Sequence, residues 1–76
     1  MIKKNLLNCL KEIFRKERIP KNIENLQFGS FDSWDSLGHL NFLLLIEKKF
    51  KVKFSFEEMY KIKTIKEIIY KINKYK

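Results

Sequence analysis

The chain has 76 residues, of which 45% are hydrophobic and 14% aromatic, and this composition predicts one small folded domain and excludes a disordered chain. Its net charge is +8, but residues 22–47 contain no Lys or Arg and carry −4, so the basic charge lies on the rest of the chain. A single cysteine excludes an internal disulfide and a cysteine-based metal site. The sequence has no signal-peptide pattern and no apolar run longer than residues 42–46, so we expect a soluble, cytoplasmic protein without a membrane span.

The first predicted element is an amphipathic helix over residues 2–17. Its apolar residues recur at steps of three and four, at Ile2, Leu6, Leu10 and Ile13. Basic residues near its end suit the negative end of the helix dipole, and Pro20 is expected to stop it. Cys9 lies on or near the apolar stripe, so we interpret it as a small core residue.

A loop is predicted over residues 18–35, where no helical or strand period is sustained. A connection of this length is uncommon inside a compact domain and usually serves a function. Apolar residues recur along it at intervals, which predicts that the loop is ordered and attached to the core. They are Ile23, Leu26, Phe28, Phe31 and Trp34.

Three further helices are predicted in the second half of the chain, over residues 36–50, 56–61 and 64–75. Asp35 precedes the first of them as an N-cap, and the S/T-x-x-E spacing predicts capping boxes for the other two, Ser55 with Glu58 and Thr64 with Glu67. Residues 51–54 alternate like a strand but have no partner strand, so a connector is expected. The fold class is therefore all-α, a bundle of three longer helices and one short helix with a long loop between the first two.

The segment DSWDSLGHL, residues 32–40, raises the question of catalysis. Ser36 and His39 are three residues apart on a helix, but a hydrolase also needs an oriented base, an oxyanion hole and a substrate site. The segment lacks the first glycine and the preceding strand of a GxSxG elbow. We therefore do not expect an enzyme, and we place His39 on the polar surface. Cap and turn chemistry explains Asp35 but leaves a serine at the first helical position unexplained.

DSLGHL followed by NFLLLIEKKF, on a four-helix pattern with a long first loop, resembles the acyl carrier protein and peptidyl carrier protein family. The resemblance covers nearly the whole chain and implies a four-helix bundle of acyl-carrier type. In that family a separate transferase attaches 4′-phosphopantetheine from coenzyme A to the serine of an Asp-Ser-Leu signature at the start of the second helix. Carried over to this sequence, the modified residue is Ser36, preceded by Asp35 and followed by Leu37. The arm ends in a thiol that holds an acyl or aminoacyl cargo as a thioester.

The resemblance also implies partners and the residues that recognise them. The expected partners are a phosphopantetheinyl transferase, an acyl-loading ligase or transferase, and downstream acyl-using enzymes of fatty acid or secondary-metabolite biosynthesis, and the carrier itself is expected to be a monomer. The residues expected to contribute to recognition are Asp32, Asp35, Leu37, Leu40 and Glu47. Relatives have an acyl cavity between their second and third helices, and the residues that could line it here, or simply belong to the core, are Leu40, Leu44, Met59 and Ile65.

Three features near the signature refine this interpretation. Ser33 is not followed by a Leu, so Ser36 is the serine that fits the family signature. Trp34 stands where many carriers have Gly or Leu, and we interpret it as a loop residue anchored in the core. The helix over residues 36–50 has Glu47 as its single carboxylate, whereas carriers often have several there for basic partners. Docking is therefore expected to rely on apolar contacts near Ser36.

The alternative function is a small basic helical module that binds nucleic acid. It is supported by the lysine-rich C-terminal segment KIKTIKEIIYKINKYK. The lysines there alternate with apolar residues, as in any amphipathic helix. The sequence also does not predict a pair of helices joined by the short turn of a helix-turn-helix motif. We therefore favour the carrier function and do not expect nucleic acid as a partner.

Overall fold

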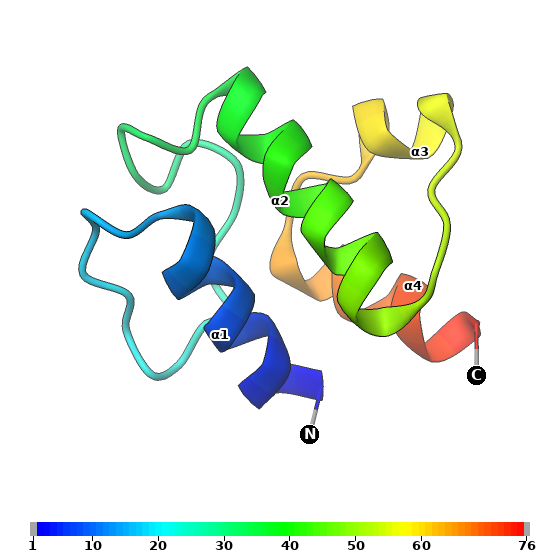
Figure 1. Cartoon of the computed structure of the whole chain (residues 1–76), viewed down its shortest axis with the longest axis horizontal. Coiled ribbons are helices and arrows are strands. Elements are labelled where there is room, and N and C mark those ends of the chain that lie inside the picture. Colours follow the sequence, from blue (N-terminus) through cyan, green and yellow to red (C-terminus); the bar gives the residue numbers. More distant parts are fainter. Residues whose placement is uncertain (1, 76) are drawn as a thin grey trace.

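Four helices make up the computed structural model, which describes residues 2–75. They are α1 (Ile2–Ile13), α2 (Ser36–Phe50), α3 (Phe56–Lys61) and α4 (Ile65–Lys74). Figure 1 shows α2 through the middle of the molecule, with α1 on one side of it and α3 and α4 on the other. Within residues 2–75, β-type pairing is limited to one isolated bridge between Gln27 and Thr64. The expectation of a small all-α fold is confirmed.

Helix α1 is shorter than the sequence predicts, because it ends at Ile13 rather than at residue 17. Phe14 still donates its backbone N–H to Leu10 at 2.8 Å, but Glu17 then donates to the carbonyl of Phe14 at 3.0 Å, which makes a turn. The buried Phe14 ring stacks on Trp34, so packing overrides the helical period at this point. Pro20 is therefore not the residue that stops the helix.

The long loop, residues 14–35, is attached to the core, as its apolar residues predict. Ile23 and Trp34 are buried, and Leu26, Phe28 and Phe31 pack against the buried cluster. Two backbone hydrogen bonds also connect the loop to the start of α4 and the residues before it. Phe28 N–H donates to the carbonyl of Lys63, and Ile65 N–H, at the first residue of α4, donates to the carbonyl of Leu26. The loop is thus part of the packed domain, and its end is held next to the start of α2.

Local cap signals were interpreted correctly. The Asp35 carboxylate accepts from the Gly38 N–H at 2.9 Å, so Asp35 caps α2. Both capping boxes are present, at the starts of α3 and α4. Residues 52–55 form a connector without helix or strand, and Lys51, with φ of 57°, ends α2 in the left-handed conformation.

The core lies where the inward faces of the longer helices meet. Its fully buried members include Leu6 and Leu10 of α1, Phe42 of α2, and Ile65 and Ile68 of α4. Cys9 is also buried, as expected of a small core residue. Among the helices of residues 2–75, none has the length and apolar character that a membrane crossing requires.

Candidate functional site

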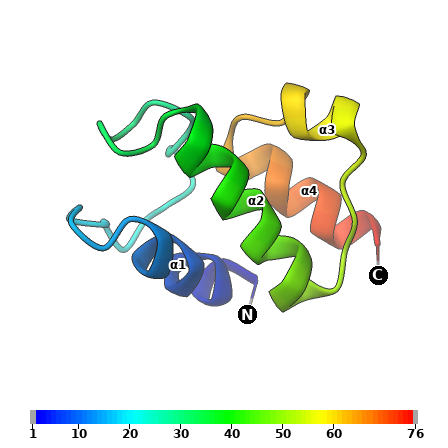
Figure 2. The same cartoon turned by 45° about the horizontal axis from the view of Figure 1, so that its top comes forward.

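Ser36 is the first residue of α2 and lies on the surface where the long loop joins the helix. Figure 2 shows this corner, with the loop end leading directly into the first turn of α2. Asp35 and Ser36 are both exposed, and Leu37 is 67% exposed. An enzyme can therefore reach the Ser36 hydroxyl without moving any part of the core.

The four serines of the chain differ in how their hydroxyl groups are used. Ser33 donates its hydroxyl to a Glu17 carboxylate oxygen at 2.8 Å. The oxygens of Ser30 and Ser55 accept the backbone N–H groups of Gln27 and Glu58. Within residues 2–75 the Ser36 hydroxyl makes no hydrogen bond, which distinguishes it from the other three serines.

His39 is buried, which corrects the expectation that it lies on the polar surface. The residue is 6% exposed, and both ring nitrogens are hydrogen-bonded. Nδ1 accepts the indole N–H of Trp34 at 2.9 Å, and Nε2 donates to the carbonyl oxygen of Ile62 at 2.7 Å. The ring is therefore neutral with its proton on Nε2, and neither nitrogen can take a proton from Ser36. Trp34, His39 and Ile62 together form what we call the His39 strut.

The His39 strut joins three separate segments of the chain. Trp34 is the last buried residue of the loop, His39 belongs to the first turn of α2, and Ile62 is the C-cap residue of α3. Trp34 is completely buried, which confirms its interpretation as a loop residue anchored in the core. Because a buried indole N–H needs an acceptor, the strut also explains why His39 lies inside the protein.

The pKa of His39 is lowered from its ordinary value of 6.5, mainly because burial disfavours the charged ring. The positive charge of Lys63 lowers the pKa further, whereas the hydrogen bond to Ile62 raises it. A second ring proton would also point at the indole N–H of Trp34. The unfolded chain therefore takes up a proton at a higher pH than the folded chain does. The neutral His39 ring therefore contributes fully to stability above the pKa that it has in the unfolded chain. This contribution is lost as the pH falls through the pKa of His39 in the folded protein.

We expect the free energy of unfolding to decline as the pH falls below about 6.5, by at most about 1.4 kcal/mol per pH unit. His39→Gln is the matched control, since its amide can accept from Trp34 and donate to Ile62 without titrating. Urea denaturation at neutral pH and at about pH 5 should show a larger loss in the wild type than in the variant. Equal losses would contradict a buried, neutral His39.

Gly38 allows the loop to approach α2 closely. A Cβ atom on Gly38 would lie 2.4 Å from the backbone oxygen of Ser33 and 3.1 Å from the ring of Phe14. No side chain fits at the first of these distances without a shift of the backbone. Gly38 therefore sets the position of residues 33–35, and with it the position of Ser36.

A small cavity lies beside Ser36, between α2 and α3. Its volume is about 140 Å³. The lining residues are Phe28, Ser36, His39, Leu40, Leu43, Met59, Tyr60 and Lys63. Of the residues expected to line an acyl cavity, Leu40 and Met59 do so. Leu44 instead lines an open groove between α1 and α2, and Ile65 is completely buried in the core.

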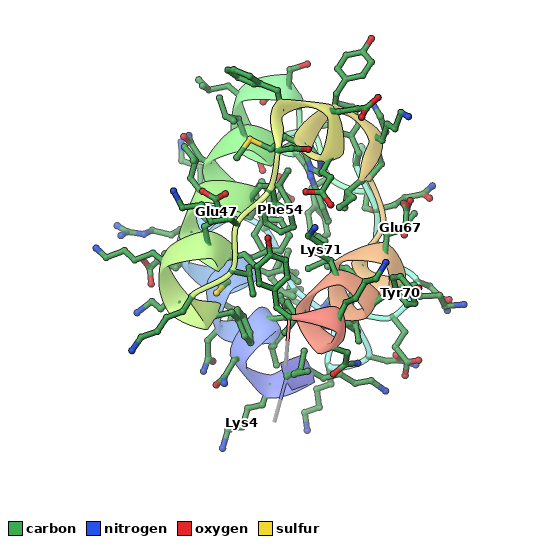
Figure 3. All side chains as sticks on the ribbon, turned by 90° about the vertical axis from the view of Figure 1, so that its right-hand side faces the viewer. Lys4, Glu47, Phe54, Glu67, Tyr70 and Lys71 are labelled. Carbon is green, nitrogen blue, oxygen red and sulfur yellow. The ribbon has the colours of Figure 1, made fainter. Side chains whose placement is uncertain are left out.

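The residues expected to recognise partners do not all lie together. Leu37 and Leu40 are exposed on the first turns of α2, and Asp32 is exposed in the adjoining loop. Glu47 is eleven residues beyond Ser36, which is about 16 Å along the helix. Its carboxylate accepts the backbone N–H of Phe54 at 2.7 Å, and Figure 3 shows the two residues next to each other. Glu47 therefore has a structural contact with the connector, away from Ser36.

The lysines of the C-terminal segment share their surface with carboxylates. Lys71 pairs with Glu58, and Lys61 pairs with Glu57 at 3.4 Å. Glu67, Tyr70 and Lys71 lie on one side of α4 in Figure 3, where a groove between α3 and α4 has both acidic and basic lining residues. This surface, with both acidic and basic side chains, is not the continuous basic patch that is typical of nucleic-acid-binding proteins.

Gly38, His39 and Lys63 are site residues that sequence reasoning missed. A signal was present for His39, because a buried Trp requires an acceptor and His39 follows Trp34 by five residues. No comparable signal exists for Gly38 or Lys63, whose roles depend on segments that meet only in three dimensions. Within residues 2–75 no three His, Cys, Asp or Glu side chains gather closely enough to hold a metal ion.

Comparisons with protein-family models, with curated proteins and with solved structures find no match for this chain.

Proposed function

We propose that the protein is an acyl or peptidyl carrier that bears 4′-phosphopantetheine on Ser36. The observation that carries the proposal is the state of the Ser36 hydroxyl, which is exposed and makes no hydrogen bond within residues 2–75, whereas Ser30, Ser33 and Ser55 each have a partner. Its place, directly after the N-cap Asp35 and before the exposed Leu37, agrees with the signature of the family that the chain resembles.

The modification requires little chemistry from the carrier. The Ser36 oxygen attacks the phosphorus that bears the pantetheine group of coenzyme A, and the bond from that phosphorus to the bridging diphosphate oxygen breaks. Adenosine 3′,5′-bisphosphate leaves, and the serine proton passes to a base of the transferase. The new phosphodiester then stands at the N-terminus of α2, where unpaired N–H groups and the helix dipole favour negative charge.

The surface around Ser36 supports partner docking through apolar contacts. Leu37, Leu40 and Leu44 are 67%, 43% and 47% exposed and follow one another along α2 at helical spacing. Asp32 and Asp35 are exposed carboxylates in the part of the loop that leads into Ser36. The transferase, the loading enzyme and the downstream enzymes would all meet this surface, because each must reach the same arm.

Incubation with coenzyme A and a broad-specificity phosphopantetheinyl transferase should add one phosphopantetheine to the wild-type protein. Ser36→Ala should abolish the addition, because no other serine hydroxyl is both exposed and unpaired in residues 2–75. Ser33→Ala is the matched control and should keep it. Intact-mass spectrometry measures all three. A wild type that several transferases leave unmodified, or a Ser36→Ala variant that still gains the mass, would refute the proposal.

A further inference from the structure

The cavity beside Ser36 is small for a cargo site. At about 140 Å³ it holds about five water-sized groups, taking about 30 Å³ for each. It is also open to solvent at the surface where Ser36 and Leu40 line it. A long acyl chain does not fit inside this volume.

The His39 strut closes the inner end of this cavity. His39 and Leu43, both lining residues, are 6% and 0% exposed. A chain that entered further would have to displace the His39 ring from Ile62 and Trp34. That displacement would leave buried donors and acceptors without partners, which is more costly than the loss of an ordinary exposed hydrogen bond.

Phe28 fixes the His39 ring from a second direction. The two rings meet edge to face, with 5.2 Å between their centroids. Phe28 is itself held by its backbone hydrogen bond to Lys63 at 2.7 Å. The inner wall therefore consists of side chains that the loop, α2 and the segment after α3 hold together.

A charged side chain lies at the outer side of the cavity. The Lys63 ammonium is 4.7 Å from the centroid of Phe28 and 5.6 Å from that of Tyr60, two rings that also line the cavity. An apolar chain that filled the space would remove water from this ammonium, which is unfavourable. A polar or very short group would leave the Lys63 ammonium hydrated.

We propose that this carrier keeps its cargo outside the helical core, and that its cargo is accordingly a short acyl group or a polar one such as an aminoacyl group. The inference rests on the proposed function of Ser36. A long apolar chain on such a carrier would remain in water, where it would promote association of the loaded protein.

The test is to load the wild-type protein with acetyl- or octanoyl-phosphopantetheine, using the two acyl-coenzyme A molecules and a broad-specificity transferase. Each methylene buried in the core would raise Tm by about 3–6 °C in a domain of this size. We expect the Tm values of the two loaded forms to agree within about 2 °C, and the methyl resonances of Leu43, Ile65 and Ile68 to be unchanged. A Tm higher by about 10 °C with octanoyl, together with shifts of those core methyl groups, would overturn the inference.

His39→Ala provides the matched comparison. Removing the ring opens the inner end of the cavity, so octanoyl should now raise Tm relative to acetyl. Equal Tm values for the two loaded forms of a folded His39→Ala variant would contradict the role of the strut, and the wild-type comparison stands if the variant does not fold. Transfer itself separates the two proposals: absence of transfer to Ser36 refutes the carrier function, whereas transfer followed by burial of octanoyl refutes only the inference about cargo.

Discussion

Replacing Trp34 with alanine is expected to lower the free energy of unfolding by about 3–5 kcal/mol. The indole is completely buried, stacks on Phe14 with 5.2 Å between ring centroids and meets Phe42 edge to face at 5.5 Å. The substitution also leaves Nδ1 of His39 without its donor. A domain of this length has a total stability of about 4–11 kcal/mol, so Trp34→Ala should leave the protein marginally folded. Urea denaturation followed by far-ultraviolet circular dichroism measures the loss.

Trp34→Phe separates packing from the hydrogen bond. Phenylalanine keeps an aromatic ring in the cluster but cannot donate to His39, so we expect a smaller loss of about 1–3 kcal/mol. Leu37→Ala, on the exposed face of α2, should change stability by about 0.5 kcal/mol or less. Were Trp34→Ala to cost no more than Leu37→Ala, Trp34 could not be the residue that anchors the loop.

Gly38→Ala is expected to destabilise the protein by about 1–3 kcal/mol, although the same change inside a helix normally stabilises by about 1 kcal/mol. The reason is the backbone oxygen of Ser33, which lies 2.4 Å from the position of the new Cβ atom. Since this oxygen is not at the end of a flexible side chain, either the loop or α2 must move. Thermal unfolding should show a Tm lower by about 4–8 °C per kcal/mol.

Asn41→Ala is the matched control for Gly38→Ala, because Asn41 is exposed on the same helix. It should change Tm little or raise it slightly, in line with the high helix propensity of alanine. A Gly38→Ala protein as stable as Asn41→Ala would show that the loop does not pack on α2 as closely as described. The Gly38 variant should also be modified more slowly at Ser36, because the loop that leads into Ser36 is displaced.

Sequence reasoning succeeded where the structural signal is local. The N-cap Asp35 and the two S/T-x-x-E boxes act within four residues, so their spacing alone predicts where α2, α3 and α4 begin. The attachment of the long loop was also predictable, because regularly placed apolar residues in a polar segment have to be buried. These signals supply the all-α class and place Ser36 at the start of a helix.

The remaining features depend on contacts between distant segments. Helix α1 ends early because Phe14 packs on Trp34, twenty residues later, and helical periodicity contains no information about that contact. A single histidine among apolar residues does not reveal its partners, so the sequence alone favours a surface position for His39. In the structure its partners are Trp34 and Ile62. Leu44 and Ile65 were grouped with a cavity that they do not line, because the pattern identifies an apolar face but not what covers it.

A carrier would have its phosphopantetheine arm on Ser36 in the cell. The most direct test is intact-mass and fragment-ion spectrometry of the protein purified from its own host without thiol reagents. We expect a mass increased by one phosphopantetheine, with or without a short or polar acyl group, and fragment ions that place the addition on Ser36. A native chain of unmodified mass, or one whose modification lies on another residue, would contradict the proposed function.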